Sequence, residues 1–335
     1  MQHILQHIRP PLVPISILKA HKVYEPSDSR FMAAARLLQA LWREEKGLSI
    51  GTHRNAKGKR YKLGSRLDTK SAEAGGNFLS PDIAQLALRE SVYCEIGAII
   101  EQERLWKNLL SSQPLCFNLF GGMKLDIEKG NHFFRHLFAD YVESIDGIYF
   151  EHSPGRGQPA YTNDYTAFDV FVPCTTIHGD NGFIAIEVKY SETMAEPLLT
   201  LRKRYSQLSR ASGIYKDPEA LALRASPLQQ LWREHLLCHS LIENGAYRSG
   251  QYVLMHPRQN VHCTGAVNAY QQQLLPQGPE SIKFLPVTLE DCVETLRAIG
   301  EGDTASALHH RYLDFERVER MIFQHRIAAE DGPPS

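Results

Sequence analysis

Apolar residues recur at helical spacing in the first third of the chain. Residues 30–46 combine that spacing with strong helix formers, which predicts a helix. A second helix is predicted from Pro81, because Ser80 before it is a favourable N-cap residue and proline is tolerated at the first helical position. With a break near Gly97, the helical pattern extends to residue 110.

The pattern then changes before the middle of the chain. Residues 113–122 predict a bend or a short strand, and residues 123–142 predict another helix, which Gly130 weakens. Further on, short runs rich in Phe, Val and Ile predict strands. These runs lie within residues 145–157 (a strand and a turn), 165–174, 182–192, 250–257 and 281–289.

Amphipathic helices are predicted between and after these strands. They lie at residues 198–212, 227–245, 289–300 and 307–326. Residues 175–182 contain two glycines and are predicted to form a hairpin turn. The order of helix, three strands, helices and strand is typical of an α/β protein with a central mixed sheet flanked by helices.

Three regions are expected along the chain: a helical N-terminal extension at residues 1–110, an α/β domain at 111–325 and a disordered tail at 326–335. Within the extension, residues 51–70 hold seven Lys or Arg residues against one acid. Because glycines also punctuate this segment, it is predicted to be a basic, mobile loop.

Composition narrows the class of protein. Hydrophobic residues make up 43% and charged residues 22% of the 335 residues, as in an ordinary globular protein. The net charge of −1 provides no overall basic field, so any surface for nucleic acid must be local. No apolar run reaches the roughly 18 residues of a membrane helix, and no signal-peptide pattern is seen. Six scattered cysteines predict reduced, mostly buried thiols and a cytoplasmic protein.

Three charged residues interrupt two strands that otherwise have a core composition. Asp169 lies in AFDVFV, and Glu187 and Lys189 lie in GFIAIEVKY. If the strands pair around a turn near residues 178–181, the two carboxylates meet near one edge of the sheet. Glu187 and Lys189 then point to the same face. Residues 183–186 are apolar on both faces, which favours a central strand ending in functional groups over a solvated salt bridge.

A divalent cation is the expected partner of these acids. Two carboxylates in a semi-buried place repel each other, and a cation removes that cost. Mg²⁺ (or Mn²⁺) prefers oxygen ligands, so Asp169, Glu187 and the backbone carbonyl of Val188 are candidate metal ligands. Such a metal can polarise a phosphodiester, while Lys189 orients the attacking water or balances the charge on phosphate.

These residues resemble the signature of the PD-(D/E)xK nuclease superfamily, which has the restriction-endonuclease-like fold. Asp169 matches the first acid and Glu187-Val188-Lys189 matches acid-x-Lys, although Phe168 stands where the signature has proline. The predicted elements from residue 122 to 256 resemble the superfamily's helix–strand–strand–strand–helix–strand core. The resemblance implies that residues 111–325 form a metal-dependent phosphodiesterase domain.

The resemblance extends to a group of bacterial PD-(D/E)xK-like proteins of poorly defined role. It rests on RLWKNLLSSQPLCFNLFG (104–121), HSPGRG (152–157) and AFDVFV (167–172). That group has an acid after FNLFG, where this chain has Gly122. Many superfamily members place an extra acid on the first core helix; here Asp126 or Glu128 is a candidate for this third acidic ligand, and the alternative is that the chain lacks it.

Candidate DNA contacts come from three basic segments, each of which has a solvated surface as its alternative interpretation. The segment at residues 51–70 is the best candidate, because clustered cations add salt-dependent affinity for phosphate. The predicted DNA-binding residues are Arg54, Lys57, Lys59, Arg60, Lys62, Arg156, Arg202 and Arg204.

Other chemistries have less support. Two histidine groups share predicted helix faces, but no spacing supplies the remaining zinc ligands; they are His132 and His136, and His235, Cys238 and His239. The sequence contains no Gly-Lys-Ser/Thr phosphate loop.

The sequence therefore predicts a Mg²⁺- or Mn²⁺-dependent deoxyribonuclease, an endonuclease acting in defence against foreign DNA or in repair. Asp169, Glu187 and Lys189 are its predicted catalytic residues. The alternative is a catalytically silent or partner-gated nucleic-acid-binding protein with the same fold. A homodimer and a partner protein both stay open, and no membrane partner is expected.

Overall fold

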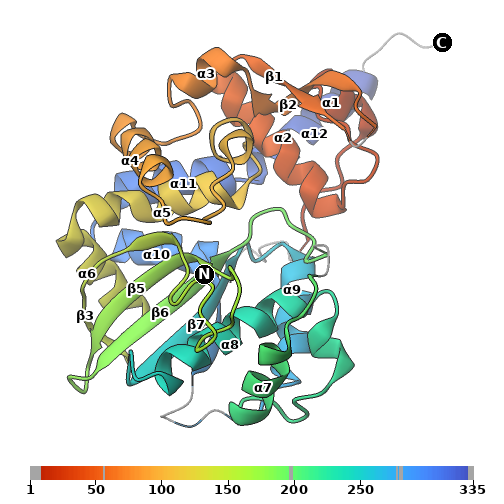
Figure 1. The fold of residues 1–335 in the computed structure, drawn as a ribbon. Coiled ribbons are helices and arrows are strands. Elements are labelled where there is room, and N and C mark those ends of the chain that lie inside the picture. Colours follow the sequence, from red (N-terminus) through yellow and green to blue (C-terminus); the bar gives the residue numbers. More distant parts are fainter. Residues whose placement is uncertain (1–8, 56, 196–198, 277, 279–281, 331–335) are drawn as a thin grey trace, which may run out of the picture.

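The computed structural model describes residues 9–55, 57–195, 199–276, 278 and 282–330. A mixed sheet of six strands is covered by helices on both faces, which confirms the predicted α/β class and the restriction-endonuclease-like arrangement (Figure 1). The strands are β3 (Val142–Ile145), β4 (Tyr149–His152), β5 (Phe168–Thr176), β6 (Asn181–Val188), β7 (Ser249–His256) and β8 (Lys283–Thr288).

The sheet is antiparallel on one side and parallel on the other. β5 pairs antiparallel with β3, β4 and β6, whereas β6, β7 and β8 run parallel to one another. β6 therefore lies in the interior of the sheet, and residues 182–188 are all buried. This confirms the central strand that the apolar run predicts.

Alternate residues of the central strands enter two separate apolar layers. Val170, Ile186 and Val253 join one layer, and Phe183, Ala185 and Leu254 join the other. The first layer is closed by α2 (Arg30–Glu45), α5 (Ser112–Leu125), α6 (Ile127–Leu137), α10 (Leu289–Ala298) and α11 (Gly302–Tyr312). The second is closed by α7 (Lys203–Ala211), α8 (Gln229–Glu243) and α9 (Val261–Gln271).

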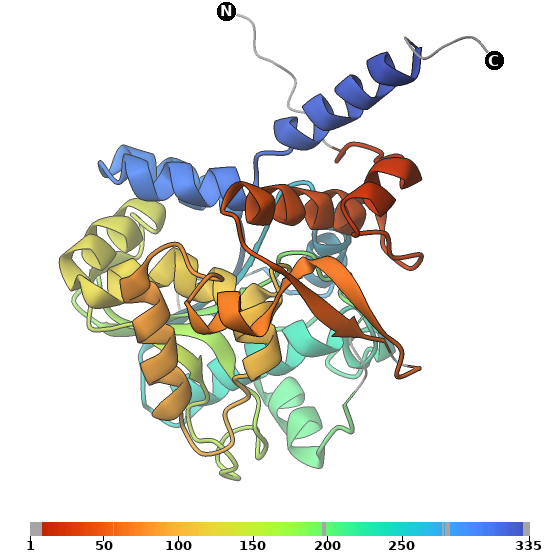
Figure 2. The same ribbon diagram turned by 90° about the horizontal axis from the view of Figure 1, so that it is seen from above.

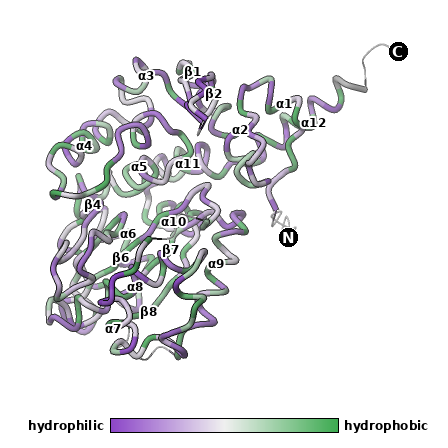
Figure 3. Tube along the Cα trace, turned by 45° about the vertical axis from the view of Figure 1, so that its right-hand side comes forward, coloured by the Kyte–Doolittle hydropathy of each residue, from purple (hydrophilic) through white to green (hydrophobic). Residues whose placement is uncertain are grey.

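The N-terminal region contains the predicted helices but also a hairpin. Ser80 caps α4 (Pro81–Val92), as predicted, because its side chain accepts a hydrogen bond from the Ile83 N–H. The predicted loop at residues 51–70 is wrong: β1 (Ile50–Arg54) and β2 (Arg60–Leu67), labelled in Figure 3, form an antiparallel pair. α1 (Ile15–Ala20) and α3 (Thr69–Glu73) complete this region.

Two predicted elements between residues 113 and 142 differ from the structure. The expected bend or short strand is instead the buried helix α5, and the expected long helix is only α6, which begins after Asp126. At Gly121, α5 packs closely on α4, because a Cβ there would lie 3.3 Å from Ile83 Cγ2. Close helix packing therefore overrides the local signal that glycine gives.

Two predicted helices are shorter or divided. Of the helical pattern up to residue 110, residues 103–107 form a single π-helical turn after α4 ends. The pattern at residues 307–326 divides between α11 and α12 (Glu316–Glu330), which projects from the body (Figure 2). Residues 326–330 are helical where a disordered tail was expected, and residues 331–335 lie outside the described residues.

The regions on either side of residue 110 share their packing. One hydrophobic cluster contains Leu37 and Leu86 from the N-terminal side together with Val170 and Ile186 from the sheet. Among the described residues, no helix combines the length and apolarity needed to cross a membrane. The cysteines form no disulfide in this part of the chain, and five of the six are buried, as predicted.

Candidate active site

Asp169, Glu187 and Lys189 meet at adjoining ends of β5 and β6. The register pairs Val170 with Ile186, which places Asp169 opposite Glu187. Asp169 Oδ2 accepts a hydrogen bond from the Val188 backbone N–H at 2.8 Å, so this carboxylate joins the two strand ends. The structure thus brings together the three residues named from the sequence.

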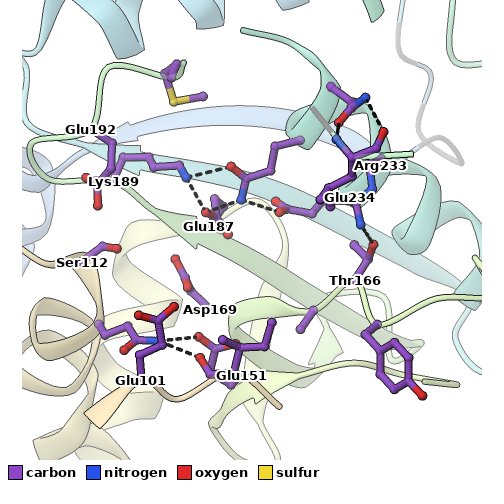
Figure 4. Close-up of a pocket in the computed structure, with 18 of the residues that line it drawn as sticks. Glu101, Ser112, Glu151, Thr166, Asp169, Glu187, Lys189, Glu192, Arg233 and Glu234 are labelled. Atoms are coloured by element: carbon purple, nitrogen blue, oxygen red, sulfur yellow. Dashed lines mark hydrogen bonds and ion pairs between the residues drawn. The ribbon is translucent and has the colours of Figure 1, made fainter. Parts of the chain in front are cut away.

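Lys189 and Glu187 form an ion pair that α8 holds in place. Lys189 Nζ lies 3.0 Å from Glu187 Oε1, and both side chains are almost fully buried. Gln230 of α8 lies against both: its Oε1 accepts from Lys189 Nζ at 2.8 Å, and its Nε2 donates to Glu187 Oε1 at 2.7 Å (Figure 4). One amide therefore fixes the relative position of the acid and the lysine.

A further acid lies behind this pair. Gln230 Nε2 also donates to Glu234 Oε1 at 2.8 Å, and the Tyr252 hydroxyl donates to Glu234 Oε2 at 2.7 Å. Burial, together with the charge of Glu187, raises the pKa of Glu234 well above its ordinary value. The Glu187–Lys189 pair is thus continuous with a hydrogen-bonded network between α8 and β7.

Glu151 of β4 supplies a further carboxylate facing the same space. Its backbone has a φ of +49°, which is unusual for a non-glycine residue and turns the chain as β4 ends. Gln113 of α5 donates from Nε2 to Glu151 Oε1 at 3.3 Å. Burial and the charge of Glu187 raise the pKa of Glu151 to about 7.

Asp169 shows the same electrostatic strain more strongly. Burial is the main cause of its pKa being raised well above the ordinary value, and the charges of Glu187 and Glu151 add to it. Lys189 and the Val188 N–H act in the opposite direction but do not cancel the shift. Acids held together against their own repulsion are typical of sites that bind a cation.

These side chains line one cavity of about 430 Å³. Six acids and four basic residues line it, so its wall carries an excess of acidic groups: Glu101, Glu151, Asp169, Glu187, Glu192 and Glu234, against Arg104, Arg156, Lys189 and Arg233. Where these acids are ionised they repel an anionic phosphodiester, and a bound cation would offset that repulsion.

The oxygen ligands suit a divalent metal. No group of three or more His, Cys, Asp or Glu side chains among the described residues is arranged to hold a metal ion. A mixed set fits better, because the buried Gln113 Oε1 has no hydrogen-bond partner and its amide contacts Glu151. Carboxylate, amide and backbone carbonyl oxygens are the ligands that Mg²⁺ prefers.

Asp126 and Glu128, the candidates for a third acid, do not reach the cavity. Asp126 caps α6, accepting from the Lys129 N–H at 3.3 Å. The prediction fails because the helix that faces the site is α5, whose N-terminal turn carries Gln113, whereas Asp126 follows its C-terminal end. A 14-residue helix separates the two ends by roughly 20 Å.

The predicted DNA-binding residues occupy three places. Arg54, Lys57, Lys59, Arg60 and Lys62 lie on the β1–β2 hairpin or its tip, outside the cavity lining. Arg156 lines the cavity, but its guanidinium donates to Gly97 O, Glu151 O and Glu95 Oε2.

The remaining two cations of that set border α7. Arg202 is exposed at the N-cap of the helix. Arg204 donates to Ala160 O, Tyr161 O and Glu243 Oε2, so it holds the loop before β5 against α8.

The histidine groups do not assemble a zinc site. His235 is fully buried, where its ring nitrogens contact the Tyr270 hydroxyl and Ile282 O. Burial lowers its pKa to about 4. His132 and His136 are exposed on α6.

Sequence reasoning missed Glu151, Gln113, Gln230 and Glu234. Gln230 and Glu234 are four residues apart, which on a helix predicts one shared face, but amphipathic helices carry many such pairs. Glu151 follows an apolar strand, as Glu187 and Lys189 do, and this signal could have nominated it. Gln113 was hidden by the wrong assignment of α5.

A sheet with helices on both faces and an acid-x-Lys pair opposite a second acid defines a restriction-endonuclease-like protein. The family model of the PD-(D/E)XK nuclease superfamily matches residues 26–314, and the chain belongs to this superfamily. No curated protein matches the chain, and no solved structure does.

Proposed function

We propose that this protein is a Mg²⁺- or Mn²⁺-dependent endonuclease that hydrolyses phosphodiester bonds in DNA. The superfamily supports a nuclease in the general sense. The observation that carries the specific proposal is the convergence of Asp169, Glu187 and Lys189 in one cavity with a clustered excess of acids.

Asp169 and Glu187, which line the cavity, would hold the metal together with the backbone carbonyl of Val188, the residue between Glu187 and Lys189. Glu151 and Gln113 lie beside them. Such an ion, when bound, lowers the pKa of a coordinated water and polarises the phosphate. Lys189 would orient the attacking water or stabilise charge on phosphate, and Gln230 would keep its ammonium group in place. The charge of such an ion would also offset the repulsion from Glu187 and Glu151, which adds to burial in raising the pKa of Asp169.

The β1–β2 hairpin is proposed as the surface that binds the DNA backbone away from the reaction. Its tip and strands carry Arg54, Lys57, Lys59, Arg60 and Lys62. Clustered cations on one projecting element give sequence-independent affinity through counterion release. A cytoplasmic role in defence or repair is the corresponding biological proposal.

The test is cleavage of supercoiled plasmid and of linear single-stranded DNA in Mg²⁺, Mn²⁺ or EDTA. Wild type is compared with Lys189→Ala and Glu187→Ala, and with Lys283→Ala, an exposed lysine on β8, as the control. We expect metal-dependent cleavage that both site variants lose by a factor of at least 100 and the control retains.

Two outcomes would contradict the proposal. Cleavage that survives both site substitutions would place the chemistry elsewhere. DNA binding without cleavage by any sample would favour a silent or partner-gated protein. The oligomeric state is measured in the same samples. A dimer would supply the two sites that are needed to cut both strands.

A further inference from the structure

The floor and the mouth of the cavity differ in chemistry. Glu187 and Lys189 on the floor are only 4% and 6% exposed. At the mouth, Ile99, Tyr165 and Leu199 line the same cavity and are 60%, 59% and 52% exposed. Three exposed apolar side chains around one acidic cavity are not needed to bind phosphate, but they suit the flat faces of nucleobases.

Tyr165 is held in position at this mouth. Gly97, with a φ of +87°, lies against the ring: a Cβ there would come within 2.8 Å of Tyr165 Cε1. The next residue, Thr166, is fixed by its N–H, which donates to Asp164 Oδ1 at 3.0 Å, and by its hydroxyl, 2.7 Å from the Tyr205 hydroxyl. Tyr165, four residues before Asp169, is therefore on a segment that hydrogen bonds hold in place.

The walls beside the mouth are tied to each other. Arg156 donates to Gly97 O at 2.8 Å on one wall and to Glu151 O at 3.0 Å on the other. Asp164 accepts from the Tyr205 hydroxyl at 2.7 Å and pairs with Arg233 at 3.2 Å, which anchors the loop before β5 to α7 and α8. The opening is thus bounded by chain segments that their hydrogen bonds hold in place.

A paired duplex fits this opening poorly. In a duplex the base faces are stacked inside, so they cannot contact an apolar rim while a phosphate reaches the floor. A volume of about 430 Å³ is that of a small-molecule pocket. Proteins that bind single strands typically offer aromatic side chains on which unpaired bases stack.

We propose that the cavity accepts an unpaired DNA strand, in single-stranded DNA or at an unpaired flap, with Tyr165 stacking on a base beside the scissile phosphate. This inference rests on the proposed nuclease function and specifies its substrate class.

Binding is measured first, without metal, so that the result does not depend on cleavage. Labelled oligonucleotides of one sequence are titrated as a single strand, as a blunt duplex and as a duplex with an unpaired flap, with fluorescence anisotropy as the readout. We expect single-strand and flap affinities at least about 10-fold above that of the blunt duplex. Loss of stacking in Tyr165→Ala should weaken single-strand binding about 5- to 100-fold.

Phe323→Ala is the control, because it removes an aromatic ring of similar exposure from α12, which contributes nothing to the cavity lining. Cleavage of the same oligonucleotides in Mg²⁺ or Mn²⁺ forms the second arm. We expect wild type to cut the single strand and the flap faster than the blunt duplex, and Tyr165→Ala to lose that preference.

Equal affinity for single strand and blunt duplex, or single-strand binding unchanged in Tyr165→Ala, would overturn the inference even if the protein cleaves DNA. Single-strand binding that depends on Tyr165 in a protein that cleaves nothing would support the inference and refute the nuclease proposal. The two proposals can therefore fail separately.

Discussion

At the scale of single residues, the cavity holds acids at the expense of folding stability. Asp169, Glu151 and Glu234 all have raised pKa values, chiefly because they are buried, with Glu187 adding repulsion in each case. An acid that is harder to ionise in the folded chain than in the unfolded chain destabilises the fold at every pH at which the unfolded chain ionises it. The site is therefore a place where neutral substitutions should stabilise the protein.

Glu151→Gln should stabilise the metal-free protein at alkaline pH. The folded pKa of about 7 lies above the ordinary 4.5, so between these values the folded chain keeps a proton that the unfolded chain has lost. Wild-type stability is therefore lost as pH rises from about 4.5 to 7, and the variant avoids this loss. At pH 8 in EDTA we expect a gain of about 1–3 kcal/mol.

Urea unfolding at pH 4.5 and pH 8 measures this gain, with Glu143→Gln, exposed on β3, as the control. The difference between variant and wild type should be small at pH 4.5. Mg²⁺ should raise the stability of wild type more than that of the variant. A gain of equal size at both pH values would show that the ionisation of the buried Glu151 carboxyl is not its cause.

Gln230→Ala tests the amide that contacts both Lys189 and Glu187. Without it, the lysine and the carboxylate keep their charges but lose a common partner that orients them. Residues that orient a metal site or its neighbours typically contribute about 10- to 100-fold to activity. We expect that loss in kcat with little change in DNA affinity; Gln207→Ala, exposed on α7, is the control.

At the scale of elements, the strands were predictable and several boundaries were not. β5, β6 and β7 follow from runs rich in apolar residues. β5 and β6 pair around residues 177–180, and this pairing brings Asp169 and Glu187 together as expected. α5 was not predictable because Pro114, Gly121 and Gly122 weaken its local helical signal. Its packing against α4 and the sheet, which no short window of sequence contains, decides the outcome.

The same limit explains why the third acid was misplaced. Asp126 and Glu128 are candidates only if the helix predicted after residue 122 is the first core helix. Once α5 occupies that place, the acid that meets Asp169 is Glu151 from β4. Its orientation depends on a backbone with φ of +49°, which local sequence does not specify.

The hairpin formed by β1 and β2 carries a prediction of its own. Replacing Lys57, Lys59 and Arg60 by alanine should weaken DNA binding and reduce its dependence on salt. Each lost phosphate contact lowers the slope of log K against log [salt] by about 0.7–0.9, so three lower it by about 2 to 3. Filter binding from 50 to 300 mM salt (roughly the range over which such slopes are read) measures this.

The control removes three exposed cations from elsewhere: Lys46, Lys283 and Arg297. Its net charge matches that of the hairpin variant, so a general charge effect would weaken both proteins equally. A slope that falls only in the hairpin variant supports local contact. Equal slopes in both variants would remove the hairpin from the DNA-binding surface.

At the scale of the whole molecule, a buried arginine connects α11, in the C-terminal part of the chain, to the N-terminal region. Arg311 of α11 is fully buried and donates to Asn77 O at 2.8 Å and to Gln39 Oε1 of α2 at 3.3 Å. Its guanidinium lies 4.1 Å from the centroid of the Trp42 ring. Among the described residues, no carboxylate accepts its hydrogen bonds, so amides, a carbonyl and aromatic rings alone compensate its charge.

Arg311→Ala should therefore destabilise the whole fold rather than one end of it. Removing the guanidinium leaves the buried Asn77 side-chain oxygen without its Arg311 donor, and it opens space beside Trp42. The Asn77 carbonyl also loses Arg311 but keeps Asn118 Nδ2 as a donor. We expect a loss of about 3–5 kcal/mol in the free energy of unfolding. Arg311→Lys should recover little of it, because an ammonium group cannot reproduce the planar set of donors.

The control is Arg320→Ala, at an exposed residue on α12, which should change stability by less than about 0.5 kcal/mol. Urea unfolding followed both by near-ultraviolet circular dichroism and by tryptophan fluorescence checks this, and a wild-type midpoint for Arg311→Ala would show that α11 and α2 do not depend on this contact.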